Sequence, residues 1–447
     1  MIGIAVLLTP MTELDPKELA NANVGASTKD GPLASPPASI QIPKPASTEL
    51  STERIQAMLV DVAKKVAESA GSEPAGFHVA AMIYSELKQT KNAENAWVRC
   101  LELKPKEPGP YLGLATLWME QGEDEKAIEL FQTIPNANVA GASYWKNYAE
   151  ALSRVGRVDE AVAIATEGLR NHPDDGSLWT QLGQAQVQQQ KWSAAESSLR
   201  KATDLGEISP AAINGLATVL VRQGKDEEAK LLREKLTSSN APANASGTFQ
   251  ETYSRALAET ALALLRNAAA VAENQKHTEW AREWLIEAIR LNPLDGNAYM
   301  DLSGVLRREN RWHDALVVHE RLLEVQPKNV LNYMNLASVA SSLGKVDVAE
   351  SVLMKGVELF PQEAFLHAEL ARLSLDTQNF SKARQRIAKA IEYEPRNVEW
   401  ILMEVLACHG MGDVAGVRDG LARARALSPQ DARIAEMVKT LKLEPGP

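Results

Sequence analysis

The 447-residue sequence is poor in cysteine, in aromatic residues and in basic charge. Its two cysteines, Cys100 and Cys408, lie far apart, so neither a disulfide framework nor a cysteine-based zinc site is expected. The 48 Lys and Arg are outnumbered by 58 Asp and Glu, which gives a net charge of −10. This balance argues against a nucleic-acid partner held by a strongly basic surface.

A long apolar run is also missing. Residues 1–8 are apolar, but Thr9 and Pro10 end the run, whereas a membrane span needs about 20 apolar residues. A secretory signal carries a basic stretch before its apolar core, and the sequence shows none before this run. Two interpretations stay open: a truncated export signal or membrane anchor, and a disordered apolar N-terminus. The expected location is therefore cytoplasmic, or exported or membrane-tethered if the run is a truncated signal.

Residues 1–50 as a whole are rich in Pro, Ala and Ser, and no Phe, Trp or Tyr occurs before Phe77. Because so few large apolar side chains cannot build a core, a disordered N-terminal segment is expected. In residues 51–73, Ser51 is a candidate N-cap and apolar residues come after it at helical spacing. This pattern predicts an amphipathic helix that packs on the first unit of the region C-terminal to it, and a helix that lies on a membrane surface is the alternative.

Signatures of catalysis and of cofactor binding are missing too. No GxxxxGK[ST] or GxGxxG motif offers a phosphate cradle. The seven histidines form no HExxH motif and no spaced cluster, and His313 and His319 are six residues apart, which does not place them on one helical face as i,i+4 ligands. No metal, no cofactor and no catalytic residue are therefore predicted, and the chain is not expected to be an enzyme.

What the sequence does contain is an internal repeat. Prolines recur at intervals of 34 residues, and similar segments precede them. They are Pro293, Pro327, Pro361, Pro395 and Pro429, and the same step leads from Pro105 through Val139 to Pro173. A fixed period of this length is the signature of stacked repeats.

Each 34-residue period predicts two helices. If the proline site is numbered position 32 of a unit, position 20 is alanine except in the last unit, which has Val417, and position 8 is also small in almost every unit. Small residues at fixed positions indicate sites where two helices approach closely. Glycines such as Gly122 and Gly344 supply the left-handed conformation that ends the first helix, and the proline ends the second. His319 falls at position 24, where other units carry large apolar residues, so it is interpreted as a packing residue and not as a ligand.

This pattern resembles the tetratricopeptide repeat over roughly residues 74–431. The resemblance implies an all-α fold, an α-solenoid in which helix-turn-helix repeats form a right-handed superhelix with a possible bend near residues 240–250. The expected organisation is a disordered segment (1–50), an amphipathic helix (51–73), an N-terminal array of about five repeats (74–243), a stretched repeat with a long helix (244–295), a C-terminal array of four repeats (296–431), and a capping helix with a tail (432–447).

The resemblance also implies a binding surface, because positions 2, 5, 9, 12 and 13 of the first helix tend to face the concave groove in this family. The candidate groove residues in the C-terminal array are Asn297, Met300, Arg307, Arg308, Leu331, Met334, Phe365 and Arg372. Methionine adapts its shape to a partner and arginine pairs with carboxylates, so an extended or helical peptide is a suitable ligand. The alternative that these are ordinary groove residues without a selected ligand stays open.

The function implied by the resemblance is that of a non-catalytic scaffold or adaptor that binds a protein or peptide of unknown identity in its groove. One alternative is an accessory or regulatory subunit of an enzyme or of an envelope assembly complex. Another is an enzyme with a site in the stretched repeat, but that segment offers a single histidine, His277.

Overall fold

The computed structural model describes residues 40–43, 51–135, 141–239 and 249–441. The chain divides into two units, Met1–Gln41 and Ile42–Pro447, and all of the described helices belong to the second. The predictions for residues 1–39, 44–50 and 442–447 lie outside the described part of the chain, as does the predicted bend at 240–248.

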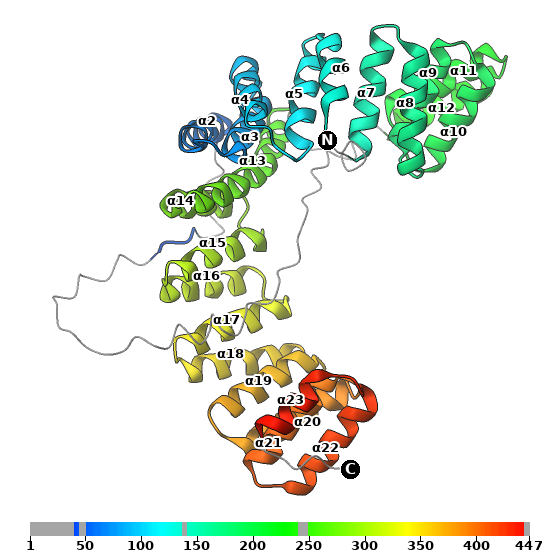
Figure 1. Cartoon of the computed structure of the whole chain (residues 1–447). Helices are drawn as coiled ribbons and strands as arrows, with labels where there is room; N and C mark the ends of the chain where they lie inside the picture. The colour runs from blue at the N-terminus through cyan, green and yellow to red at the C-terminus, as the bar shows by residue number, and fades with distance from the viewer. Residues whose placement is uncertain (1–39, 44–50, 136–140, 240–248, 442–447) are drawn as a thin grey trace. The chain divides into compact units, whose positions relative to one another are not determined.

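The described residues are all-helical, with 22 helices and no strand, as predicted (Figure 1). In the first half these are α2 (Thr52–Ser69), α3 (Pro74–Glu86), α4 (Thr90–Glu102), α5 (Gly109–Glu120), α6 (Asp124–Thr133), α7 (Ala142–Arg154), α8 (Val158–Asn171), α9 (Gly176–Gln188), α10 (Trp192–Asp204), α11 (Pro210–Arg222) and α12 (Asp226–Ser239). In the second half they are α13 (Phe249–Asn274), α14 (Thr278–Leu291), α15 (Gly296–Arg308), α16 (Trp312–Val325), α17 (Val330–Ser342), α18 (Val346–Leu359), α19 (Ala364–Asp376), α20 (Phe380–Tyr393), α21 (Val398–Gly410), α22 (Val414–Leu427) and α23 (Ala432–Thr440).

From α3 onward the helices pack as consecutive pairs, and each pair packs on the next, except that within the described residues α11–α12 does not pack on α13–α14. We call the first helix of a 34-residue unit helix A and the second helix B. The turn between them is tight because position 15 has a positive φ in all ten units from 74 to 431, counting 262–295 as one. Five of these residues are glycine: Gly122, Gly156, Gly224, Gly344 and Gly412. The other five are Lys88, Gln190, Lys276, Asn310 and Gln378.

The turn from helix B to the next helix A is fixed by residues that come after the proline. Position 34 is often Asp, Asn or Ser, and its side chain accepts a hydrogen bond from the backbone at the start of helix A. The Asp175 carboxylate, for example, accepts from the Leu178 N–H at 2.9 Å. Proline therefore ends one helix two residues before a capping side chain begins the next.

The small residues lie where the helices of a pair meet. The alanines at position 20 are fully buried, as are most residues at position 8. Gly183 at position 8 shows the cause, because a Cβ atom built on it would lie 2.5 Å from Leu199 Cγ, at position 24 of the same unit. A larger residue at position 8 would push the two helices apart.

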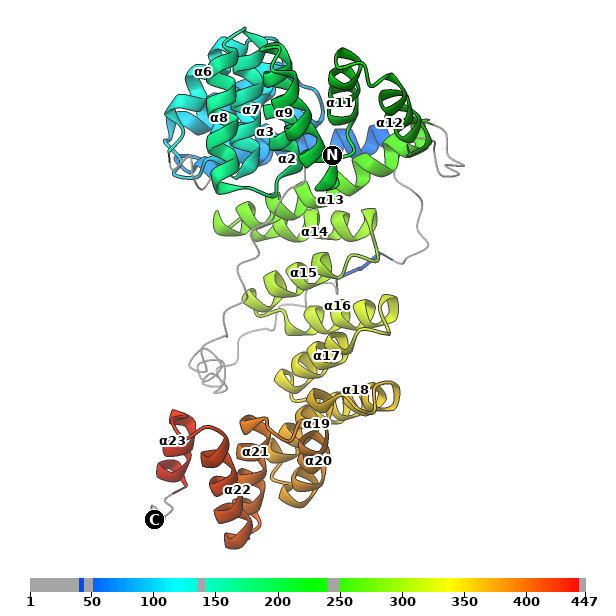
Figure 2. The same cartoon turned by 90° about the vertical axis from the view of Figure 1, so that its right-hand side faces the viewer.

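The predicted stretched repeat at 244–295 is longer than a 34-residue unit because its first helix, α13, is unusually long. Its second half and α14 together have the features of an ordinary unit over 262–295, with Ala269 at position 8, Ala281 at position 20 and Pro293 at position 32. Residues 249–261 extend helix A of this unit in the N-terminal direction. The extension contacts α2 through Ser254 and Tyr253, and α13 as a whole contacts both α2 and α3 (Figures 1 and 2).

Candidate functional site

The A helices share one side of each array. Consecutive A helices contact one another directly, as α7 does with α9, α9 with α11, α17 with α19 and α19 with α21. Positions 2, 5, 9, 12 and 13 of these helices are the candidate groove positions. The side chains at these positions range from exposed, as for Leu331, to buried, as for Ala368.

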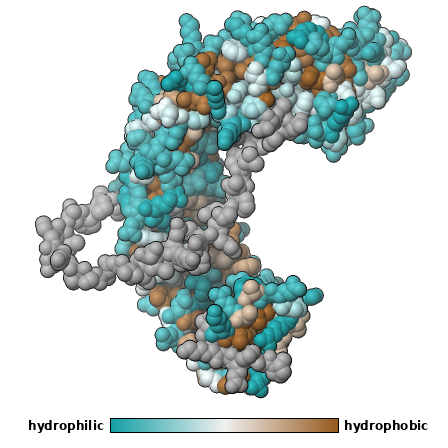
Figure 3. Space-filling model, in the orientation of Figure 1, coloured by the Kyte–Doolittle hydropathy of each residue, from teal (hydrophilic) through white to brown (hydrophobic). Residues whose placement is uncertain are grey.

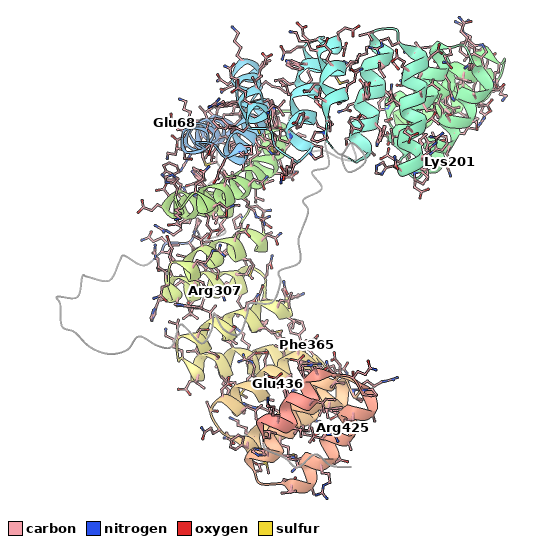
Figure 4. The ribbon with its side chains drawn as sticks, in the orientation of Figure 1. Glu68, Lys201, Arg307, Phe365, Arg425 and Glu436 are labelled. Carbon is pink, nitrogen blue, oxygen red and sulfur yellow. The ribbon has the colours of Figure 1, made fainter. Side chains whose placement is uncertain are left out.

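Two apolar groove candidates of the C-terminal array are open to solvent. Leu331 on α17 is 61% exposed and Phe365 on α19 is 45% exposed, and both occupy position 2 of consecutive units. The Phe365 ring, labelled in Figure 4, meets the buried Trp400 ring edge-on, with centroids 5.2 Å apart. Figure 3 shows apolar side chains at the surface over several units. Phe365 thus has one face fixed against the core and another free for a ligand.

The two methionines lie deeper than Leu331 and Phe365. Met300 and Met334 are both half-buried on α15 and α17. The sulfur of Met300 accepts a hydrogen bond from the Asn335 amide of the next unit at 3.6 Å.

The polar groove candidates form hydrogen bonds or ion pairs with nearby residues of the same chain. The Asn297 side chain is exposed and donates to the Asp295 carboxylate at 3.3 Å. Arg308 forms a two-point ion pair with Glu273 of α13, one contact at 2.7 Å. Arg372 pairs with Glu369 at 2.6 Å and with Asp376 at 3.2 Å. These two arginines are therefore already paired with carboxylates of the same chain.

Arg307 differs from the other two arginines. It is half-buried, and its guanidinium lies over the Trp312 ring, 5.2 Å from the centroid. Burial, and secondarily the nearby Arg308 cation, lower the pKa of Arg307. Its side chain is directed toward the turn and helix B of its own unit, which makes it part of the packing (Figure 4).

The N-terminal array has a hollow that the sequence did not single out. It lies between α9 and α11, has a volume of about 590 Å³ and is lined mainly by amides and small residues. The lining residues are Gln184, Val187, Gln188, Pro210, Ala211, Asn214, Gly215 and Thr218. Gln184 and Gln188 occupy positions 9 and 13 of their helix A, but a hollow also needs the small Ala211 and Gly215 opposite them, which only the packing of α11 on α9 reveals.

The buried titratable groups lack the features of a reaction centre. Burial raises the pKa of the Cys100 thiol to about 11, and the thiol donates to the Pro74 carbonyl oxygen at 3.3 Å. His319 is 2% exposed and its Nε2 atom lies 2.8 Å from the Ser303 hydroxyl. Within the described residues no group of three His, Cys, Asp or Glu side chains could hold a metal ion. In the same part of the chain, no helix combines the length and the apolar character needed to cross a membrane.

Comparison with known families gives matches in both arrays. Models of the tetratricopeptide repeat match residues 85–151, 142–185, 180–244 and 332–363. Tetratricopeptide repeat protein 37 of Xenopus laevis is 26% identical over 221 residues, which is 48% of this chain and 14% of that protein. The chain thus spans only a small part of that relative.

Solved structures of low sequence identity are also similar. MamA is 14% identical with a TM-score of 0.33 and covers 38% of this chain and 94% of its own. YrrB, described as a TPR protein with an unusual peptide-binding site, is 16% identical with a TM-score of 0.32 and covers 39% of this chain and 91% of its own. The APC/C hetero-tetramer Cut9–Hcn1 is 12% identical with a TM-score of 0.31 and covers 88% of this chain and 93% of its own.

Proposed function

The chain is a tetratricopeptide repeat protein, and we propose that it is a non-catalytic scaffold that binds a protein partner through an apolar segment of that partner. The observation that carries the proposal is the exposure of Leu331 and Phe365 at equivalent positions of consecutive units. Large apolar side chains exposed in register on one side of an array offer regularly spaced anchor points.

The chemistry of the surroundings favours an uncharged segment. Arg308 and Arg372 are paired with carboxylates of the same chain, so a partner carboxylate would have to displace Glu273 or Glu369. An apolar side chain that packs on Leu331, Phe365 and the half-buried Met334 has no such competitor. The proposed ligand is therefore a peptide with apolar anchors, held by shape and burial more than by charge.

The proposed organisation keeps two arrays, 74–243 and 296–431, with residues 244–295 between them, a helix at 51–73 and a cap at 432–447. Only the second array carries the proposed apolar surface. The hollow between α9 and α11 of the first array includes the amides of Gln184, Gln188 and Asn214 in its lining.

A pull-down that compares three forms of the full chain tests the proposal. The first is unchanged, the second carries Leu331→Asp and Phe365→Asp, and the third carries Val348→Asp and Met354→Asp on α18, which are also exposed, at 38% and 50%, but lie on a B helix. A partner bound by the first and third forms and lost from the second supports the proposal. The same set of partners with all three forms would show that this surface is not the binding site.

A further inference from the structure

Two helices that are far apart in the sequence lie side by side. The hydroxyls of Thr52 at the start of α2 and Ser254 near the start of α13 are 2.6 Å apart, although 202 residues separate them. At the other end of α2, the Ser69 hydroxyl donates to the Gln275 side chain at 2.7 Å. Because both ends of α2 match α13 in the same order, the two helices run parallel along the whole length of α2.

The contact between α2 and α13 is formed by buried apolar side chains. Five α2 side chains are at most 1% exposed: Ile55, Leu59, Val62, Ala63 and Val66. On α13, Leu257, Ala261, Leu264, Leu265 and Ala268 are at most 2% exposed. Helix α3 contacts both α2 and α13, so the three helices bury their apolar faces together. The alanines of α13 permit this close approach.

Elsewhere in the arrays a helix A packs on the helix B that precedes it in the sequence. The helix before α13 is α12, and its exposed residues in the described part are mostly charged, including Asp226, Glu227, Lys230 and Arg233. A polar outer face of this kind is typical of the terminal helix of a repeat array. Helix α12 thus closes the first array, and α13 uses the first helices of the chain as its partner.

We propose that α2 is an intramolecular clasp, through which α13, and with it the second array that stacks on α14, docks on the beginning of the first array. The two arrays stay associated through the α2–α3–α13 core independently of the covalent connection at residues 240–248. The clasp also fixes how the amide-lined hollow of the first array and the apolar surface of the second are presented to partners. This inference does not depend on the proposed function, since it concerns the chain's association with itself.

Cleavage of the connection tests the clasp. A recognition sequence for a site-specific protease is placed within residues 240–248 of the full chain, and the cleaved protein is analysed by size-exclusion chromatography with mass measurement. The two fragments are expected to elute together at the mass of the uncut chain. Separate elution of the two fragments at micromolar concentration would overturn the proposal.

Two variants show whether α2 holds the two fragments together after cleavage. Leu59→Asp, which places a carboxylate in the shared core, is expected to release the fragments after cleavage, whereas Val98→Asp on α4, where the side chain is 39% exposed, leaves them together. Fragments that still elute together in Leu59→Asp would mean that another contact holds them.

A cross-link supplies a readout that does not depend on tolerance of Leu59→Asp. In the cleaved chain, Thr52→Cys with Ser254→Cys is expected to join the two fragments covalently on mild oxidation, because the replaced hydroxyls are 2.6 Å apart. Thr52→Cys with Arg255→Cys is the matched control, since the Arg255 side chain is exposed. The native Cys100 and Cys408 are buried and do not compete. Equal yields in the two pairs would contradict the parallel placement of α2 and α13.

Discussion

The Tyr333 hydroxyl donates a hydrogen bond to the Pro327 carbonyl oxygen at 2.9 Å, and so ties the start of one helix A to the end of the helix B before it. The same link recurs between Tyr299 and Pro293 at 3.1 Å. In another unit the Trp179 indole N–H donates to the Pro173 carbonyl at 2.8 Å. The aromatic at position 4 is therefore both a packing residue and a donor to the carbonyl of the proline that ends the preceding helix.

Removing this donor alone should weaken the unit boundary. Tyr333→Phe keeps the ring, which is fully buried, but leaves the Pro327 carbonyl without its partner, so we expect a loss of about 0.5–1.5 kcal/mol. Hydrogen exchange of the α17 amides measures the change locally. Tyr111→Phe is the control, because the Tyr111 hydroxyl forms no hydrogen bond within the described part of the chain. Equal effects of the two substitutions would mean that the hydroxyl of Tyr333 adds nothing to stability.

Much of the fold could be predicted from the sequence, because the pattern of Pro327 and Tyr333 repeats with a fixed period. The hydrogen bond between them could not, since it depends on the turn geometry. The left-handed turn position was visible only where it is glycine, as in Gly344, and not where Gln378 or Lys276 adopts the same conformation. The pairing of α2 with α13 left no periodic signal, because it occurs once and joins residues 202 positions apart.

For the candidate site, the sequence indicated the position of the apolar residues but not the ion pairs of the arginines. The apolar groove candidates Leu331 and Phe365 are open to solvent, in line with their position in the unit. For the arginines, the sequence could not show which carboxylates lie within reach, because Glu273 belongs to a helix one unit earlier than Arg308. Whether these residues bind a partner stays a prediction.

Glycines at the turn and inside a helix should respond to alanine with opposite signs. Gly344 has a φ of +70°, which an L side chain rarely adopts, so Gly344→Ala should cost about 1 kcal/mol. Gly304 lies inside α15 with a negative φ, and an added Cβ would make only an ordinary contact with Arg308, so Gly304→Ala should stabilise by about 0.5–1 kcal/mol. Thermal melting of both variants compares the two directly. A stabilising Gly344→Ala would show that the turn can adopt another conformation.

The buried His319 should make the stability of the second array depend on pH. Burial, and secondarily the Arg307 cation, lower the pKa of His319 to about 4, whereas an unfolded histidine titrates near 6.5. Between these two values the unfolded state binds more protons, so stability should fall as the pH is lowered from about 6.5 toward 4. A pKa shift of this size corresponds to a change of about 3 kcal/mol in the free energy of unfolding.

Urea unfolding of the full chain at several pH values between 4 and 7 measures this dependence. In the double variant His319→Leu with Ser303→Ala, both partners of the 2.8 Å hydrogen bond become apolar, as at equivalent positions of other units. The double variant should lose part of the pH dependence. The neutral-to-acid change in stability should stay the same in His313→Leu, since the His313 side chain is exposed. An unchanged slope in the double variant would mean that His319 is not the group responsible.

The three arginines named as groove candidates should separate into two classes when truncated. Arg308→Ala and Arg372→Ala remove ion pairs of partly exposed side chains, so each should change stability by no more than about 1 kcal/mol. Arg307→Ala removes a half-buried stem and the contact with the Trp312 ring, and should cost about 1–3 kcal/mol. Thermal melting and the fluorescence of Trp312 follow the change. If Arg307→Ala were as mild as the other two, the contact of Arg307 with the Trp312 ring would contribute little to stability.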